Sequence, residues 1–416
     1  MGKFVIEGGK RLCGKIKAER AKNSVLPIIA ASLLTEEEVV IKDCPDIADV
    51  KNMLAIVGEL GVNYRIEDDN LIMKNDGLKK SCVSRELSRK LRSSVLLAGA
   101  LVAVSRRAEI AFPGGCRIGK RPVDMHLAAL NVLGVKTEES ETSVSFSCDR
   151  LCGGVIELSI PSVGATENAL IAACAAEGET LIKNAAREPE IVDLANFLRA
   201  MGGKISGAGT EIIRVTGVKK FHGTEYRPVF DRIETGTYLV AAAITGGEIE
   251  ISGVRAENIS ALIGKLCDNT CKMSVKNDII YLRAGKRRSP VFVKTGYYPY
   301  FPTDMQAQTT ALAAVSDGVS VIEESVFENR FSYTSELNKM GADISVNGRT
   351  AIVNGVKRLC GAEVCAEDLR GGAALVLAGL NAEGKTVVSG SEHIERGYAH
   401  IEKKLKELGA DIVKTE

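Results

Sequence analysis

The chain has 416 residues, more than a single hydrophobic core ordinarily serves, so two or three domains are expected. Hydrophobic residues make up 45% and charged residues 26%, which is typical of a globular protein and excludes a disordered one. The 54 Lys and Arg residues nearly balance the 53 Asp and Glu residues, and the net charge of +1 argues against a general nucleic-acid-binding protein with a broad basic face.

The N-terminal segment has no uninterrupted apolar stretch like that of a signal peptide. The longest apolar runs, such as residues 94–104, fall short of the roughly 18 residues of a membrane span. We therefore expect a cytoplasmic protein without a membrane segment. The 11 cysteines are scattered, and neither close pair (Cys148/Cys152 and Cys267/Cys271) has a further Cys or His at zinc-ligand spacing. Most are expected to be reduced thiols, and no metal is expected.

The main organisational feature of the sequence is an internal repeat. An apolar-periodic helix that ends in a turn and runs into a short strand recurs along the chain. The turn positions are Gly61, Gly134, Gly202, Cys267, Gly341 and Gly409. Glycine suits a helix C-cap, because a positive φ there carries no Cβ penalty. The copy at Cys267 lacks this glycine and is expected to end its helix differently.

A second, apolar and Ala-rich helix precedes each of these segments. These helices are predicted within residues 24–34, 93–103, 167–176, 235–244, 304–315 and 371–380. Ala-rich helices without a polar face are usually buried, and a β-branched strand follows each one. Each unit therefore reads strand–helix–strand–helix–strand–strand.

Six such units, three per domain, predict two similar α/β domains with helices inside and sheets outside. We place the first domain at residues 21–229, which carries the loop around Cys116. The second combines residues 1–20 with 230–416, so that the N-terminal strand completes it. Two similar domains imply a cleft between them, and we expect the active site there.

The starts of several apolar helices carry basic residues. Free N–H groups and the positive end of the helix dipole suit an anionic ligand there. Ser, Thr and Asp at such positions have an ordinary explanation as N-caps. Lys22, Arg92 and Arg370 do not, because a cation is unfavourable there unless an anion is close. We infer a ligand role for these three residues.

Two further features are open to a structural or a functional interpretation. Asp304, at the start of the fifth apolar helix, is either an N-cap or a general base that takes a proton from a substrate hydroxyl. Arg330 and Arg396 occupy corresponding parts of the fifth and sixth units, where each is either a solvated surface side chain or a ligand contact.

The loop PGGCRIGKRPVDMH, residues 113–126, is the most informative stretch of the chain. Two glycines before Cys116 make the loop sterically open, and Arg117, Lys120 and Arg121 surround the thiol with positive charge. Such surroundings lower the pKa of a thiol and favour its reactivity. We therefore single out Cys116 as the candidate reactive cysteine.

Taken together, the motifs resemble those of the UDP-N-acetylglucosamine enolpyruvyl transferase family across almost the whole chain. They are AKNSVLP, PGGCRIGKRPVDMH, PSVGATENALIAA, AREPEIVDLANFLRAMGGKISGAGT, DRIETGTY, YPYFPTDMQAQ, FENRF, DLRGGAALVLAGL and IERGY. The resemblance implies a pair of inside-out α/β barrels, each of three repeated units. It also implies the first committed step of peptidoglycan synthesis: the 3-hydroxyl of UDP-N-acetylglucosamine adds to C2 of phosphoenolpyruvate, and phosphate leaves from a tetrahedral intermediate.

The resemblance assigns roles to individual positions. Lys22, Arg121 and Arg396 would hold the phosphate of phosphoenolpyruvate, and Arg370 with Arg330 its carboxylate. Asp304 would accept the proton of the 3-hydroxyl, and Cys116 would protonate C3 and be alkylated by fosfomycin. The positions matched to contacts with UDP-N-acetylglucosamine are Asn23, Arg92, Arg121, Pro122, Val123, Asp124, Ser162, Val163, Gly164, Thr303, Asp304 and Val326.

Partners and alternatives also follow from the resemblance. The partners would be the two small-molecule substrates, with no metal or organic cofactor, nucleic acid or membrane. One alternative is 5-enolpyruvylshikimate-3-phosphate synthase, which shares the fold and chemistry but has a Pro-Gly-Ser-Lys-Ser stretch that is absent here. The other is a non-catalytic paralogue that binds a nucleotide sugar.

Overall fold

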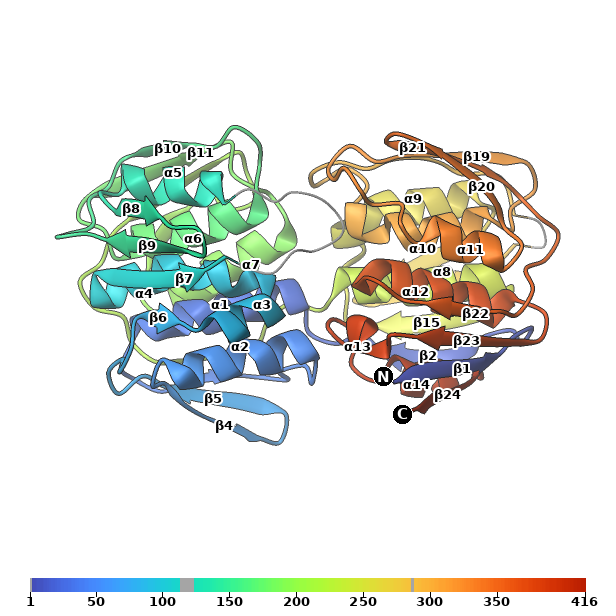
Figure 1. Cartoon of the computed structure of the whole chain (residues 1–416), viewed down its shortest axis with the longest axis horizontal. Coiled ribbons are helices and arrows are strands. Elements are labelled where there is room, and N and C mark those ends of the chain that lie inside the picture. Colours follow the sequence, from blue (N-terminus) through green and yellow to red (C-terminus); the bar gives the residue numbers. More distant parts are fainter. Residues whose placement is uncertain (1, 113–122, 286–287) are drawn as a thin grey trace. The chain divides into compact units, whose positions relative to one another are not determined.

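The computed structural model describes residues 2–112, 123–285 and 288–416. These residues form two compact α/β units. Unit 1 comprises described residues 2–19 and 230–416, and unit 2 comprises described residues 20–112 and 123–229. In Figure 1, unit 2 runs from blue to green, and unit 1 is mainly yellow to red with two blue N-terminal strands. Within the described ranges, no helix is long and apolar enough to cross a membrane.

All the sheets of the described chain share one topology. Each has four strands, of which the first two are parallel and the remaining neighbours antiparallel. In unit 2 the orders are β14 (Thr224–Tyr226), β3 (Val39–Ile41), β5 (Asn70–Lys74), β4 (Asn63–Glu67); β6 (Cys82–Val83), β7 (Arg107–Ala111), β9 (Ser143–Ser147), β8 (Lys136–Glu139); and β10 (Val155–Glu157), β11 (Glu179–Lys183), β13 (Ile212–Thr216), β12 (Lys204–Ser206).

The sheets of unit 1 repeat this order. They are β2 (Cys13–Lys17), β15 (Glu248–Ser252), β17 (Ile279–Arg283), β16 (Lys272–Lys276); β18 (Phe292–Lys294), β19 (Val319–Glu323), β21 (Thr350–Asn354), β20 (Asp343–Asn347); and β22 (Glu363–Cys365), β23 (Lys385–Ser389), β1 (Lys3–Glu7), β24 (Asp411–Thr415). Strand β1 lies between β23 and β24, so the N-terminal segment is an interior strand of the sheet that also contains the C-terminal strand.

The apolar helices form the core of each unit. In unit 1, α8 (Arg232–Thr245), α10 (Gln306–Ala313) and α12 (Leu369–Asn381) contact one another pairwise, and each also contacts a sheet. In unit 2, α4 (Leu97–Ser105) contacts both α1 (Lys22–Ala31) and α6 (Val163–Cys174). All 14 residues of α8 are buried, as expected for a helix without a polar face.

The other helices are more amphipathic or short. They are α2 (Ala48–Glu59), α3 (Arg85–Lys90), α5 (Asp124–Val132), α7 (Pro189–Ala200), α9 (Ser260–Asp268), α11 (Thr334–Lys339), α13 (Ser391–Ile394) and α14 (Ile401–Glu407), with 3₁₀ turns η1 (Ser32–Leu34), η2 (Arg92–Leu96), η3 (Ala256–Ile259) and η4 (Thr303–Met305).

The predicted turn glycines adopt the left-handed conformation that the sequence requires. Gly61, Gly134, Gly202, Gly341 and Gly409 have φ between 88° and 103°. The turn position assigned to Cys267 is wrong. Cys267 lies inside α9, and Thr270 takes the left-handed position with φ 73°.

The hydrogen bonds explain this correction. The N–H of Gly61 donates to the carbonyl of Gly58, and the N–H of Val62 donates to that of Val57. In the fourth unit the same two bonds are made by Thr270 to Cys267 and by Cys271 to Leu266. The two hydrogen bonds that end the helix are therefore the same in the first and fourth units. In the fourth unit the left-handed residue is Thr270, a β-branched residue that the sequence does not predict at such a turn.

Candidate active site

The candidate site in unit 1 centres on the carboxylate of Asp304, in η4. One carboxylate oxygen, Oδ1, lies 2.8 Å from Nη2 of Arg330. The other, Oδ2, lies 2.9 Å from Nη2 and 3.2 Å from Nε of Arg370. Both arginine side chains are 4% exposed, whereas that of Asp304 is 28% exposed. A carboxylate between two buried guanidinium groups is a strongly charge-assisted arrangement.

Of the two interpretations of Asp304 left open by the sequence, the N-cap does not hold. Pro302 is the N-cap residue of η4 and Met305 that of α10, and neither helix start has a side-chain capping hydrogen bond. The side chain of Asp304 instead pairs with Arg330 and Arg370.

Arg370 occupies the first turn of α12, where Asp368 is the N-cap. The Asp368 carboxylate accepts hydrogen bonds from the N–H groups of Arg370 (2.9 Å) and Gly371 (3.0 Å). Burial lowers the pKa of Arg370, but the charge and hydrogen bond of Asp304, together with Tyr398 and Asp231, raise it, so that the pKa lies above its ordinary value. Arg370 is therefore a permanently charged group inside the unit.

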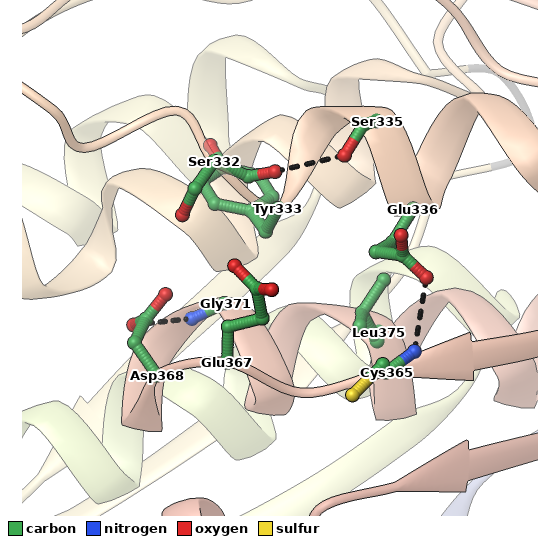
Figure 2. A pocket seen from close by; sticks show the side chains of 9 residues that line it. All are labelled: Ser332, Tyr333, Ser335, Glu336, Cys365, Glu367, Asp368, Gly371 and Leu375. Carbon is green, nitrogen blue, oxygen red and sulfur yellow. Dashed lines mark hydrogen bonds between the residues drawn. The ribbon is translucent and has the colours of Figure 1, made fainter. Parts of the chain in front are cut away.

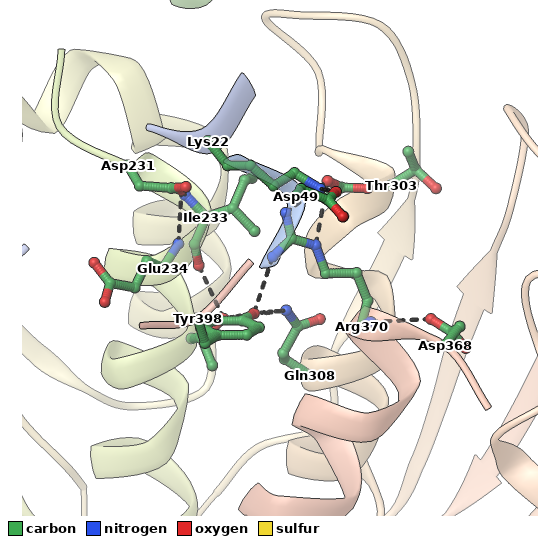
Figure 3. A network of polar contacts seen from close by, with 12 residues as sticks. Lys22, Asp49, Asp231, Ile233, Glu234, Thr303, Gln308, Asp368, Arg370 and Tyr398 are labelled. Atoms are coloured by element: carbon green, nitrogen blue, oxygen red, sulfur yellow. Dashed lines mark hydrogen bonds and ion pairs between the residues drawn. The ribbon is translucent and has the colours of Figure 1, made fainter. Parts of the chain in front are cut away.

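A buried tyrosine completes the surroundings of Arg370 (Figure 3). Nη1 of Arg370 donates to the Tyr398 hydroxyl at 3.1 Å, and the guanidinium carbon lies 5.5 Å from the ring centre. The same hydroxyl lies 2.8 Å from Oγ1 of Thr237 and 3.2 Å from Nε2 of Gln308. Burial raises the pKa of Tyr398, so the hydroxyl stays protonated.

Glu324 fixes the backbone near Arg330. Its Oε2 accepts a hydrogen bond from Oγ1 of Thr303 at 2.8 Å, and its Oε1 accepts one from the N–H of Val326 at 2.8 Å. Nη2 of Arg330 also donates to the Thr303 carbonyl at 3.4 Å. Thr303, Asp304 and Val326, all predicted sugar contacts, are thus tied together locally.

Arg396 lies in the turn after α13, two residues before Tyr398, and is half-buried. It belongs to the same unit as Asp304, Arg330 and Arg370.

In unit 2, Lys22 is the first residue of α1 and Asn23 the second. Nζ of Lys22 lies 3.1 Å from Oδ2 of Asp49 on α2, whose side chain is only 1% exposed (Figure 3). An anion therefore accompanies Lys22, as the dipole argument requires, just as Asp304 accompanies Arg370. In both cases the anion is a carboxylate of the protein, so a cation at a helix start does not by itself demand a ligand.

The predicted nucleotide contacts Ser162, Val163 and Gly164 form the start of α6. Ser162 is the N-cap, and its Oγ accepts from the N–H of Ala165 at 3.4 Å. Val123 is the N-cap residue of α5, and Asp124 is the first residue of that helix.

His126 on α5 is a residue that sequence reasoning did not assign. Its Nδ1 lies 2.9 Å from Nδ2 of Asn168, and a Cβ built on Gly164 would lie 3.0 Å from its Cε1 atom. Burial lowers the pKa of His126 to about 4, so the ring is neutral near pH 7. Its place in the 113–126 motif was the only available signal.

Several predicted residues cannot be placed. Cys116, Arg121 and Pro122 lie outside the described residues. Arg92 opens η2, but its side chain is not described.

A separate small pocket, open to solvent, lies where α11 approaches the start of α12 (Figure 2). Its lining residues are Ser332, Tyr333, Ser335, Glu336, Cys365, Glu367, Asp368, Gly371 and Leu375. Glu336 accepts a hydrogen bond from the N–H of Cys365 at 2.9 Å. Across the parts of the chain that the structure describes, no group of three or more His, Cys, Asp or Glu side chains is placed to hold a metal ion.

Comparisons with known proteins identify the fold and the family of the chain. The structure of the enolpyruvyl transferase NikO from Streptomyces tendae superposes with a TM-score of 0.89 at 24% identity, covering 100% of this chain and 99% of the other. The fold is thus that of enolpyruvyl transferases. Residues 6–405 match the family model of EPSP synthase (3-phosphoshikimate 1-carboxyvinyltransferase).

Full-length relatives narrow the family. UDP-N-acetylglucosamine 1-carboxyvinyltransferase 2 of Caldanaerobacter subterraneus subsp. tengcongensis is 49% identical over 415 residues, covering 100% of both chains. The protein of the same name from Carboxydothermus hydrogenoformans is 46% identical over 414 residues, covering 99% of each. The chain belongs to the EPSP synthase family and, within it, to the UDP-N-acetylglucosamine 1-carboxyvinyltransferases.

Proposed function

We propose that this protein is a cytoplasmic transferase that moves the enolpyruvyl group of phosphoenolpyruvate to the 3-hydroxyl of UDP-N-acetylglucosamine, the first committed step of peptidoglycan synthesis. The names of its full-length relatives support this substrate pair. The structural observation that carries the proposal is the Asp304 carboxylate held between the guanidinium groups of Arg330 and Arg370. This arrangement combines a proton acceptor with donors suited to a carboxylate or phosphate.

The proposed reaction is an addition followed by an elimination. In the addition, Asp304 takes the proton of the 3-hydroxyl, the hydroxyl oxygen bonds to C2 of phosphoenolpyruvate, and Cys116 delivers a proton to C3. In the elimination, C3 returns a proton to the Cys116 thiolate and the bond from C2 to the phosphate oxygen breaks. The double bond is restored, and the phosphate leaves with the proton held by Asp304. Preorganised positive charge stabilises the anionic groups throughout.

Binding of phosphoenolpyruvate is assigned to basic residues. We assign its phosphate to Lys22, Arg121 and Arg396, and its carboxylate to Arg370 and Arg330. Arg330 supports this role because its buried Nε has no hydrogen-bond partner among the described residues, which leaves a donor available for a ligand oxygen.

Binding of the nucleotide sugar is assigned to residues of both units. The proposed contacts are Asn23, Arg92, Arg121, Pro122, Val123, Asp124, Ser162, Val163, Gly164, Thr303, Asp304 and Val326. The first N–H groups of α6, which have no carbonyl partner within the helix, suit a diphosphate oxygen. In the same proposal, residues 21–229 and residues 1–20 with 230–416 are two inside-out α/β barrels, and the active site draws on both.

Phosphate release tests the proposal. The protein is mixed with phosphoenolpyruvate and either UDP-N-acetylglucosamine or shikimate 3-phosphate, and inorganic phosphate is measured. Release with the nucleotide sugar alone is expected. Release only with shikimate 3-phosphate would favour the 5-enolpyruvylshikimate-3-phosphate synthase alternative, and release with neither would favour a non-catalytic paralogue.

The assignment of Cys116 gives a separate prediction. A serine hydroxyl is a far weaker nucleophile and acid than a cysteine thiol in basic surroundings. We expect Cys116→Ser to lose alkylation by fosfomycin, followed by mass spectrometry, and to turn over at least about tenfold more slowly. Cys360→Ser, at an exposed cysteine distant in sequence, is the control and should behave as the wild type. Full activity of Cys116→Ser would contradict a catalytic role for the thiol.

A further inference from the structure

The hydroxyl of Tyr398 is a shared point of contact for three elements of unit 1. Its side chain is 1% exposed. It binds Arg370 at the start of α12, Thr237 on α8 and Gln308 on α10 (Figure 3). Gln308 Nε2 also donates to Oγ1 of Thr237 at 3.1 Å, so the three polar groups around the hydroxyl are themselves connected.

The direction of these hydrogen bonds follows from the available donors. Oγ1 of Thr237 donates its hydrogen to the Ile233 carbonyl at 2.9 Å, so it can only accept from Tyr398. The Tyr398 O–H therefore donates to Thr237, and the Tyr398 oxygen accepts from Arg370 and Gln308. This uses the one donor and both acceptor positions of the phenol, which leaves the hydroxyl no second orientation.

A fixed acceptor on one edge of a guanidinium group orients the other edge, because the group is planar. Nη1 of Arg370 binds Tyr398, and its Nε and Nη2 both bind Oδ2 of Asp304. The ring of Tyr398 adds a cation–π contact to the same guanidinium. Tyr398 thus fixes the plane of the Arg370 guanidinium group, and with it the direction in which Nε and Nη2 donate to Asp304.

We propose that Tyr398 is a positioning residue for the reaction: its hydroxyl, oriented by Thr237 and Gln308, holds the Arg370 guanidinium so that the Asp304 carboxylate is aligned for proton transfer. This inference rests on the proposed function of Asp304. Tyr398 acts through Arg370 and needs no contact with substrate.

The first test compares two buried tyrosines. Tyr398→Phe keeps the ring and its volume but removes the hydroxyl, and we expect kcat to fall about tenfold while KM for UDP-N-acetylglucosamine changes less than about twofold. Tyr333→Phe is the control, since the hydroxyl of Tyr333 is also buried and makes two side-chain hydrogen bonds, to Gln306 and Thr310. A general packing effect would lower kcat in both variants, which would overturn the inference.

A second pair of variants separates the hydrogen bond from the volume of the side chain. Thr237→Val removes the acceptor for Tyr398 with little change in shape, and should lower kcat about threefold to fivefold. Thr237→Ser keeps the hydroxyl and should retain at least half of the wild-type kcat. Equal values for the two variants would overturn the orienting role of Thr237.

Coupling between Tyr398 and Asp304 tests the inference without turnover. Both side chains bind Arg370, so the effects of Tyr398→Phe and Asp304→Asn on the unfolding equilibrium constant should be non-additive by at least about threefold in a double-mutant cycle. In an Arg370→Lys background, which lacks Nη1, the coupling should fall below about 1.5-fold. If the two effects are additive in the protein that retains Arg370, the inference is overturned, whether or not the wild type releases phosphate. If the wild type releases no phosphate, only the proposed function is refuted.

Discussion

At the scale of single residues, burial and partners decide the state of each ionisable group. Asp304, Glu234 and His126 are all polar residues of the first turn of a helix or close to it, yet their surroundings differ. Asp304 is paired with two arginines, Glu234 is enclosed with a lysine, and His126 is buried against an amide. Polar residues near helix starts therefore support different chemistry in different surroundings.

The role of Asp304 predicts a large loss of turnover without an equal loss of binding. Asp304→Asn keeps the shape of the side chain but removes the proton acceptor, and we expect kcat to fall about a hundredfold. The dissociation constant of UDP-N-acetylglucosamine, measured by calorimetry, should change less than about fivefold. Equal losses of turnover and binding would indicate a purely structural carboxylate.

Glu234 predicts a pH-dependent contribution to stability. Its side chain is 2% exposed, and its carboxylate binds Lys404 at 2.8 Å and the N–H of Glu19 at 2.7 Å. Burial raises the pKa of Glu234 to about 7 despite the lysine. The folded protein therefore holds a proton that the unfolded chain loses near pH 4.5, so this contribution to stability is lost as the pH rises from about 4.5 to about 7.

The matched variant for this prediction is Glu234→Gln, which cannot titrate. Relative to it, the wild-type free energy of unfolding should fall by about 3 kcal/mol over that pH window, measured by urea denaturation at several pH values. A constant difference between the two proteins would show that Glu234 is ionised throughout.

At the scale of secondary-structure elements, helix ends carry much of the specific information. Asp231 and Asp368 cap α8 and α12 through two backbone N–H groups each, as expected of Asp at these positions. At the C-terminal ends of α8 and α10, backbone carbonyls of both helix ends accept hydrogen bonds from Arg288. Its Nε and Nη2 donate to the carbonyls of Ala243 and Ile244, and its Nη1 donates to that of Val315.

Arg288 is therefore predicted to stabilise the packing of these two helices. A cation at helix C-termini interacts favourably with the dipoles and satisfies carbonyls that have no partner within the helix. Arg288→Met keeps the apolar stem, and we expect the free energy of unfolding to drop by about 2 kcal/mol. Arg283→Met, which removes an exposed ion pair with Glu248, is the control and should cost less than about 0.5 kcal/mol. Equal costs would contradict a specific capping role.

At the scale of the whole molecule, the two units differ in how the chain builds them. Every described strand in the sheets of unit 2 lies between residues 20 and 229. Unit 1 needs β1 and β2 from the N-terminus in two of its sheets. Its completion therefore joins segments more than 400 residues apart, as in the pairing of Lys3 with Thr415.

This difference predicts the behaviour of fragments. Residues 20–229 should fold alone with a cooperative thermal transition, because no strand of their sheets comes from elsewhere. Residues 230–416 should not fold alone. Without residues 1–20, one sheet would lack its interior strand β1 and another its edge strand β2, and apolar core residues would be exposed. Addition of a peptide spanning residues 1–20 should restore folding of the second fragment, followed by circular dichroism. Cooperative folding of 230–416 alone would contradict this view.

The sequence by itself determined the elements of the structure. The apolar helices, the strands after them and five left-handed glycine turns are visible because their signals are local: hydrophobic periodicity, alanine content and the conformational freedom of glycine. The α/β class and the family follow from the same motifs. The choice of Asp304, Arg330 and Arg370 as candidate residues was also available from the sequence, and the structure brings these three together.

Only the tertiary structure decided how those residues are paired. Asp304 meets Arg330 and Arg370 across 26 and 66 residues of sequence, and Tyr398 meets Thr237 across 161. No local pattern encodes such contacts, because they depend on how helices of different units pack. For the same reason the sequence could not foresee that Thr270 rather than Cys267 closes the fourth unit, or that Asp49 neutralises Lys22. Local sequence signals determine which helices, strands and turns form, and long-range packing determines which charged side chains pair.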